Sequence, residues 1–155
     1  MSTDPQERIK LAYEAYTRMV LQAAVNYIEG DEAVDRIWIY TDLGHEAIET
    51  ALFFRFNGTF CSHSKIGEVD TSREYDPHGL LAEFEDEVEF ELVDALREGP
   101  DFPERIITVY NPQSGELDSD WDYEDVLDRD DENDSYGKAR DRWIRRMGGK
   151  PIFGR

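Results

Sequence analysis

The dipeptide Asn57-Gly58 restricts the fold more than any other feature, because it lies between two runs of strand-forming residues. Asn-Gly readily adopts the positive backbone angles of a two-residue hairpin turn. The run before it, 50–57, contains three phenylalanines, and the run after it extends over about 59–66. A third run, 36–42, is dense in β-branched and aromatic residues. Together the three runs predict an antiparallel meander.

Three other segments have the three- and four-residue apolar spacing of amphipathic helices. They are predicted over residues 3–30, 76–99 and 135–147, with Thr3 and Asp76 placed to cap the first two. The apolar positions of these helices are Ile9, Tyr13, Tyr16, Val20, Ala23, Tyr27, Leu81, Phe84, Val88, Leu92, Ala95, Tyr136, Ala139, Trp143 and Met147.

A second hairpin is predicted between the last two helices, with strands over 104–110 and 116–123. The order α-β-β-β-α-β-β-α then predicts an α+β fold with one mainly antiparallel sheet of five strands and three packed helices. We expect a single domain over 1–155, with 148–155 as a short C-terminal tail. The predicted core residues are Trp38, Phe54, Phe84, Leu92, Val109, Trp121 and Trp143, with Ile107 on the same face as Val109.

The composition limits the class of partner. The chain has 36 acidic and 17 basic residues, a net charge of −19, yet 39% of its residues are hydrophobic, which is enough for a folded core. A nucleic-acid binder needs cations to displace counterions from phosphate, so we expect no nucleic acid as partner. Anionic membranes are disfavoured for the same reason. The charge instead attracts a basic protein surface.

The charge is also segregated along the chain. Residues 118–134 contain ten acids and one base, a local charge of −9, whereas residues 135–155 contain seven bases and one acid. Such segregation is unfavourable in a compact state unless opposite charges meet. One interpretation is that the basic last helix lies against the acidic body.

Cys61 is the only cysteine, which excludes an intrachain disulfide and a thiolate zinc cage. Its place in a predicted strand indicates a half-buried thiol and not a nucleophile. The N-terminus lacks the basic start and apolar run of a signal peptide, and no stretch is apolar enough to span a membrane. We therefore expect a cytoplasmic protein.

The sharpest local pattern is an alternation of acids in the last predicted strand. Side chains alternate between the two faces of a strand, so four carboxylates would share one face. This acidic ladder consists of Asp118, Asp120, Asp122 and Glu124. Trp121 and Tyr123 would lie on the opposite face, anchored in the core. Like charges about 7 Å apart are unfavourable unless a cation or a cationic protein surface neutralises them.

Several interpretations of the acidic ladder are open. A calcium loop starting at Asp118 would need glycine at its sixth position and glutamate at its twelfth, where the chain has Tyr123 and Arg129. A pair of catalytic carboxylates would be unspecific in so acidic a chain. A docking strip for basic side chains and a purely solvated edge strand are the remaining interpretations.

Motifs of an enzyme are not apparent. His45, His63 and His78 fall in no recognised catalytic or metal-binding spacing, and the chain has no glycine-rich phosphate loop and no nucleophile elbow. We therefore expect neither an enzyme nor a bound cofactor or metal.

The segment 119–125, Ser-Asp-Trp-Asp-Tyr-Glu-Asp, resembles the Asp/Tyr-rich segment of the YezG-like family of bacterial immunity (antitoxin) proteins. Arg140 and Trp143 look like that family's Arg and Trp in its last helix, and 37–40 is similar to its first strand. The resemblance covers residues 8–146, while the tail and the acidic stretch 128–134 depart from the pattern.

The resemblance implies a cytoplasmic immunity protein that binds and neutralises a basic, nuclease-type toxin in the cell that makes it. The residues expected to bind the toxin are Asp118, Asp120, Asp122, Glu124 and Asp125. The alternatives are a small metal-dependent enzyme that uses the same carboxylates, or a regulatory partner of a basic host protein.

Overall fold

The computed structural model describes residues 4–44 and 47–150, and within them it has five helices and one five-stranded sheet. The elements in chain order are α1 (Pro5–Tyr27), β1 (Val34–Asp42), β2 (Glu49–Phe56), β3 (Thr59–Ser62), α2 (Ile66–Val69), α3 (Pro77–Ala82), α4 (Asp86–Glu98), β4 (Arg105–Tyr110), β5 (Leu117–Asp122) and α5 (Tyr136–Arg146). All strand pairs are antiparallel, in the order β3-β2-β1-β4-β5. The α+β class and the single five-stranded sheet are thus confirmed. No helix among these residues is long and apolar enough to cross a membrane.

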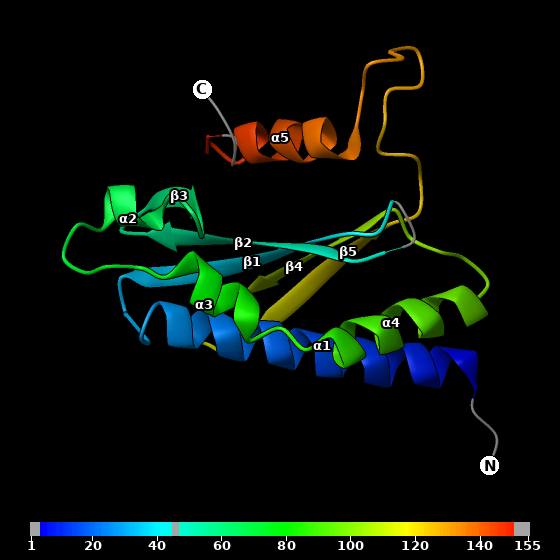
Figure 1. Ribbon diagram of the computed structural model, residues 1–155, viewed down its shortest axis with the longest axis horizontal. Coiled ribbons are helices and arrows are strands. Elements are labelled where there is room, and N and C mark those ends of the chain that lie inside the picture. The colour runs from blue at the N-terminus through cyan, green and yellow to red at the C-terminus, as the bar shows by residue number, and fades with distance from the viewer. Residues whose placement is uncertain (1–3, 45–46, 151–155) are drawn as a thin grey trace.

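The helices lie on both faces of the sheet. Figure 1 shows α1, α3 and α4 on one face and α5 across the other, with the short α2 beside β3. These two sides of the sheet are called the α1 face and the α5 face below. The N-cap of α1 is Asp4, whose carboxylate accepts from the Gln6 amide at 3.1 Å, and not the expected Thr3. Thr3, His45 and most of the tail 148–155 lie outside the described residues.

The first hairpin forms as predicted. Asn57 and Gly58 have φ angles of +49° and +83°, the left-handed values of the expected two-residue turn. The return strand is shorter than predicted, because β3 ends at Ser62. The amide of Lys65 donates to the carbonyl of Ser62 at 3.0 Å, which bends the chain into α2 and brings the side chain of Ile66 into the core.

Hydroxyl groups orient α1 across the sheet. The Tyr16 hydroxyl, fully buried, lies 2.9 Å from the Thr41 Oγ1 of β1 and 2.7 Å from the Thr50 Oγ1 of β2. The Tyr13 hydroxyl lies 2.5 Å from the Thr108 Oγ1 of β4. Because buried hydroxyls need partners, these three bonds fix the helix against three neighbouring strands.

The helix predicted over 76–99 is in fact two helices, α3 and α4. Glu85 between them is extended, with φ −90° and ψ 121°, and its amide donates to the Met19 sulfur at 3.0 Å. The break places Asp86, Glu87 and Glu89 in the first turn of α4, at the positive end of its dipole. In one continuous helix the same acids would repel each other in mid-helix.

Aromatic packing attaches α5 to its face of the sheet. Its N-cap is Ser135, whose hydroxyl accepts from the Lys138 amide. The buried ring of Trp143 has its centroid 5.2 Å from that of Tyr40, 5.1 Å from that of Phe53 and 5.7 Å from that of Phe60. This aromatic cluster is the main contact between α5 and the sheet.

The predicted core residues differ in burial. The buried ones are Trp38, Phe54, Leu92 and Trp143, and the half-buried ones are Phe84, Val109 and Trp121. Ile107 and Val109 share the α5 face, as predicted. Trp121 is half-buried because β5 is an edge strand, so only one side of its ring, toward Tyr13 at a centroid distance of 5.0 Å, is packed.

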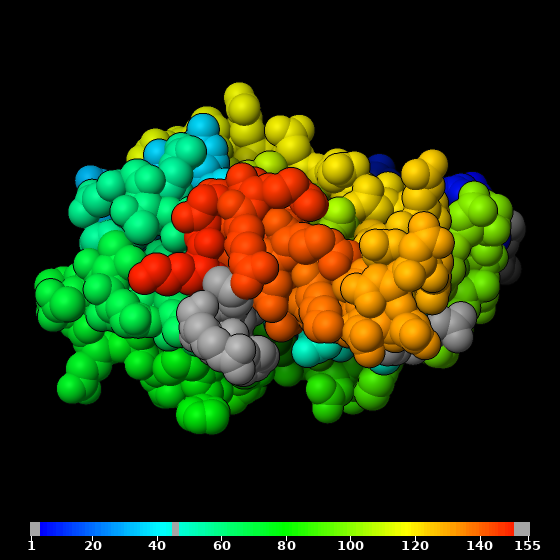
Figure 2. All heavy atoms as spheres, turned by 90° about the horizontal axis from the view of Figure 1, so that it is seen from above, coloured from blue at the N-terminus to red at the C-terminus, as the bar shows by residue number. Residues whose placement is uncertain are grey.

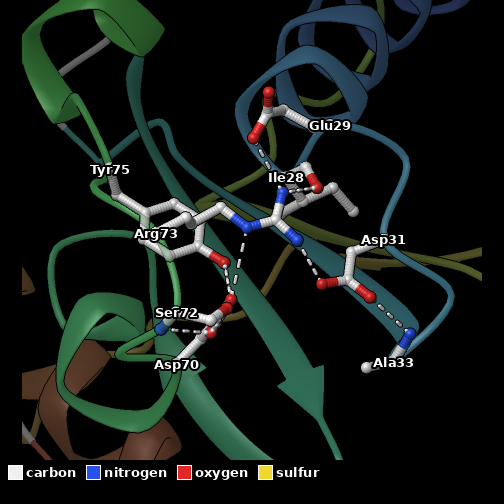
Figure 3. Close-up of polar contacts among 8 residues, drawn as sticks. All are labelled: Ile28, Glu29, Asp31, Ala33, Asp70, Ser72, Arg73 and Tyr75. Carbon is white, nitrogen blue, oxygen red and sulfur yellow. Dashed lines mark hydrogen bonds and ion pairs between the residues drawn. The ribbon is translucent and has the colours of Figure 1, made fainter.

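An arginine in the connection after α2 holds the end of α1 (Figure 3). Arg73 donates through Nη1 to the Ile28 carbonyl at 2.7 Å and to Glu29 at 3.0 Å, and through Nη2 to Asp31. Its Nε lies 3.3 Å from the buried Asp70 carboxylate. The arginine thereby satisfies a carbonyl that the helix end leaves without an intrahelical partner.

We expect Trp143→Ala to lower the free energy of unfolding by about 3–5 kcal/mol, because it removes the buried ring that packs α5 against the sheet. Trp121→Ala should cost roughly half of that, since its ring is half-buried. Urea denaturation of the two variants checks this order. An equal or larger cost for Trp121→Ala would contradict it.

The contacts around Arg73 and Asp70 predict that the fold loses stability in acid. Hydrogen bonds from Ser72 and Tyr75, together with Arg73, lower the pKa of Asp70 to about 2. An unfolded Asp titrates near 3.9, so this carboxylate stabilises the fold above about pH 4 and the contribution is lost as the pH falls toward 2. Thermal unfolding of Asp70→Asn should therefore vary less between pH 4 and 2 than that of the parent. Glu116→Gln, on the exposed second hairpin, is the control and should keep the parental slope.

Candidate partner-binding site

Edge strand β5 displays the predicted alternation of acids. Asp118, Asp120 and Asp122 lie opposite residues of β4 that belong to the α5 face, so their side chains share that face. Their Cα partners in β4 are Val109, Ile107 and Arg105. Glu124 lies beyond the end of β5, so the strand itself holds three of the four carboxylates of the acidic ladder.

These carboxylates are not equivalent. Asp122 is half-buried and accepts from the Arg105 Nε at 2.6 Å, while the Arg105 Nη1 donates to the Tyr40 hydroxyl at 3.2 Å. Asp118, Asp120 and Glu124 are exposed, and no cation of the described residues lies within ion-pair distance of them. Asp122 is therefore part of the packing, whereas Asp118 and Asp120 are open to a partner.

Asp125 serves the local turn. Its carboxylate pairs with Arg129 and accepts from the Leu127 amide at 3.1 Å. Farther along, the amide of Asp130 donates to the Asp128 carboxylate at 3.0 Å. In the same way, the amide of Asn133 donates to the Asp131 carboxylate. Aspartates of the acidic stretch thus build its turns, a role that the repeated two-residue spacing could have indicated.

The basic helix meets the acidic stretch at one ion pair. Arg142 of α5 donates to both carboxylate oxygens of Asp134, at 2.8 and 2.9 Å, and the Asp128 amide donates to the same carboxylate at 2.7 Å. These contacts hold the pKa of Asp134 well below its usual range. Arg145 and Arg146 remain exposed. The basic helix therefore offsets only part of the acidic charge near it.

Seen from the α5 side, α5 covers the middle of this face, and the yellow segment that contains β5 borders it (Figure 2). The carboxylates of β5 thus lie along the rim of the covered region. Tyr123, expected in the core, is 52% exposed. That prediction was wrong because the strand ends at Asp122, so the alternation does not reach the next residue.

The α1 face of β5 borders a shallow groove that the sequence did not indicate. One hollow of about 400 Å³ lies between α1 and β5 and has a mixed lining: Tyr13, Leu21, Val25, Tyr110 and Leu117, together with Glu14, Thr17, Arg18 and Gln22. A second, of about 490 Å³, shares Tyr13 and is lined also by Ile9, Leu96, Pro100, Trp121 and Tyr123 and by the polar Gln6, Lys10, Asp101 and Ser119. We call the two hollows together the α1–β5 groove. Leu21 and Val25 flank the predicted apolar stripe of α1, which is the signal that sequence reasoning passed over.

The described residues offer little for nucleophilic catalysis or metal binding. No group of three or more His, Cys, Asp or Glu side chains there could hold a metal ion. Cys61 is buried, and not half-buried as expected, and burial raises its thiol pKa to about 11. Burial also lowers the pKa of His63, whose Nδ1 lies 3.3 Å from the Leu52 carbonyl, while His78 is exposed.

One close pair of carboxyl groups, Glu104 and Asp125, lies just beyond the acidic ladder and contacts α5. Burial, and next the neighbouring Asp125 carboxylate, raise the pKa of Glu104. The Tyr136 hydroxyl of α5 lies 3.3 Å from Glu104 Oε1 and donates to it. Both carboxyl groups thus have partners within the protein, so the pair is a structural contact.

Comparison with known proteins does not identify a family: no family model matches the chain, and no curated protein matches it.

The Glu104 pair predicts a pH-dependent gain of stability. Because the folded-state pKa of Glu104 is raised, its ionised form destabilises the fold at neutral pH, and this penalty disappears as the pH falls through that pKa. Glu104→Gln should raise the melting temperature at pH 7, with a gain that shrinks toward pH 4. Calorimetric unfolding at both pH values measures it, and a gain that is independent of pH would contradict the assignment.

Proposed function

We propose that this protein binds a basic partner protein along edge strand β5. The observation that carries the proposal is that Asp118 and Asp120 are exposed on the same face of a paired strand and lack a cation within ion-pair distance in the described part of the chain. Two neighbouring like charges on a rigid strand repel each other. A cationic side chain placed between them relieves that repulsion.

The rigid setting favours rapid and specific binding. Asp118 and Asp120 belong to a strand paired with β4 over its whole length, so little backbone order is lost when a partner binds. The net charge of −19 attracts a basic partner over a long range and raises the association rate. Close charge pairs across an interface contribute from about 1.5 kcal/mol upward.

The specific form of the proposal is an immunity protein that neutralises a basic, nuclease-type toxin in the cytoplasm of the cell that makes it. Support comes from the resemblance of segment 119–125 to the YezG-like immunity proteins and from the chemistry of nucleases. A nuclease presents cations to phosphate, and carboxylates at strand spacing can occupy such a groove. The immunity protein must also bind the toxin before the toxin acts, and electrostatic steering speeds that association.

The test uses the C-terminal domain of a large protein encoded next to this gene, where one is found, as the toxin candidate. The double variant Asp118→Asn/Asp120→Asn should fold as well as the parent, because the repulsion between the two carboxylates is removed. It should associate more slowly and bind about ten-fold more weakly, with a smaller salt dependence. Asp122 is left intact, because its bond to Arg105 would confound the result.

The matched control is Glu74→Gln/Glu87→Gln, which removes the same charge from exposed positions away from β5. It should change affinity little. If the β5 variant protects cells and binds as well as the parent at both low and high salt, the proposal is wrong. Tight calorimetric binding of calcium, magnesium or manganese by the parent would instead favour the metal-dependent enzyme.

A further inference from the structure

The outer edge of β5 is unpaired. It is the last strand of the sheet, and its register with β4 is uninterrupted from Leu117 to Asp122. The segment contains no proline, and no other described strand pairs with it. Edges of this kind are usually blocked by a bulge, a proline or a covering element, because they otherwise accept another strand.

The backbone groups available at this edge can be assigned. Just beyond the paired strands, the Asn111 amide donates to the carbonyl of Glu116, which lies opposite it in the continued register, so the odd-numbered residues of β4 bond to β5 and the even-numbered ones to β1. The partners of those odd-numbered residues are the three aspartates of β5. Leu117, Ser119 and Trp121 therefore direct their N–H and C=O groups outward.

The two sides of the edge differ in chemistry. On the α1 face the edge borders the α1–β5 groove, whose lining includes Leu21, Val25 and Trp121, and Leu117 beside it is 44% exposed. The α5 face of the same edge carries the exposed Asp118 and Asp120. A strand added here would direct alternate side chains to carboxylates and to the α1–β5 groove, whose lining is mostly apolar but includes Lys10 and Arg18.

We infer that β5 accepts an extended segment of the partner as a sixth strand, in which apolar side chains enter the α1–β5 groove and the alternate, basic side chains face Asp118 and Asp120. The inference rests on the proposed function and specifies its partner: an extended segment of alternating basic and apolar residues. Backbone hydrogen bonds would supply affinity and the two-sided pattern would supply specificity.

Charge excludes the most obvious competitor, a second copy of this chain. Antiparallel pairing of β5 with β5 would bring the carboxylates of the two copies onto the same face and next to each other. Like charges on neighbouring strands are destabilising, so charge repulsion disfavours pairing between the β5 edges of two copies. A basic segment has no such penalty.

The probe is a capped synthetic peptide in which Lys and Val alternate, and the control is a peptide of the same composition with its Lys and Val in blocks. Binding is followed by NMR at low salt. The alternating peptide should bind about ten-fold more tightly than the control. The amides of Leu117, Ser119 and Trp121 should then become protected from hydrogen exchange, because they gain acceptors.

Ser119→Pro is the matched variant, since it removes an outward N–H and leaves the bonds to β4 in place. It should lose the preference for the alternating peptide. Equal binding of both peptides, or protection confined to other strands, would overturn the sixth strand while leaving the acidic site intact. Binding of neither peptide would overturn it as well, and the toxin experiment with Asp118→Asn/Asp120→Asn would still decide the proposed function separately.

Discussion

The two-sided burial of β1 is the constraint on which the rest of the structure depends. Ile37 and Ile39 are fully buried on one face, and Trp38 and Tyr40 are buried on the other. A central strand that is apolar on both faces needs a layer on each side. The chain supplies α1 for the first layer and α5 for the second.

This layered core is covered by a surface in which acids have several different uses. Some begin helices, as in the first turn of α4, and others cap the turns of the acidic stretch. Asp70 and Asp134 accept hydrogen bonds that stabilise their ionised forms. The net charge alone therefore overstates the acidity available for binding. The carboxylates of Asp118 and Asp120 stand apart because they lack such a partner among the described residues.

Local signals predicted much of the fold and less of the site. Turn and cap chemistry at Asn57-Gly58 and Asp76 acts over a few residues, so the sequence identifies it directly. The break at Glu85 could not be read in the same way, because apolar spacing continues across it and the sulfur that receives its amide comes from α1. Alternation identified the shared face of the three aspartates of β5, but the bond from Asp122 to Arg105 and the α1–β5 groove depend on tertiary neighbours.

The position of α5 in the chain has a consequence for synthesis on the ribosome. The strands and the helices of the α1 face all precede α5, and more than ten residues separate it from β5. A nascent chain can thus complete its sheet while Trp38, Phe53 and Phe60 still face water. Until Trp143 emerges and docks, that aromatic surface is a site where a chaperone, or another unfinished chain, can bind.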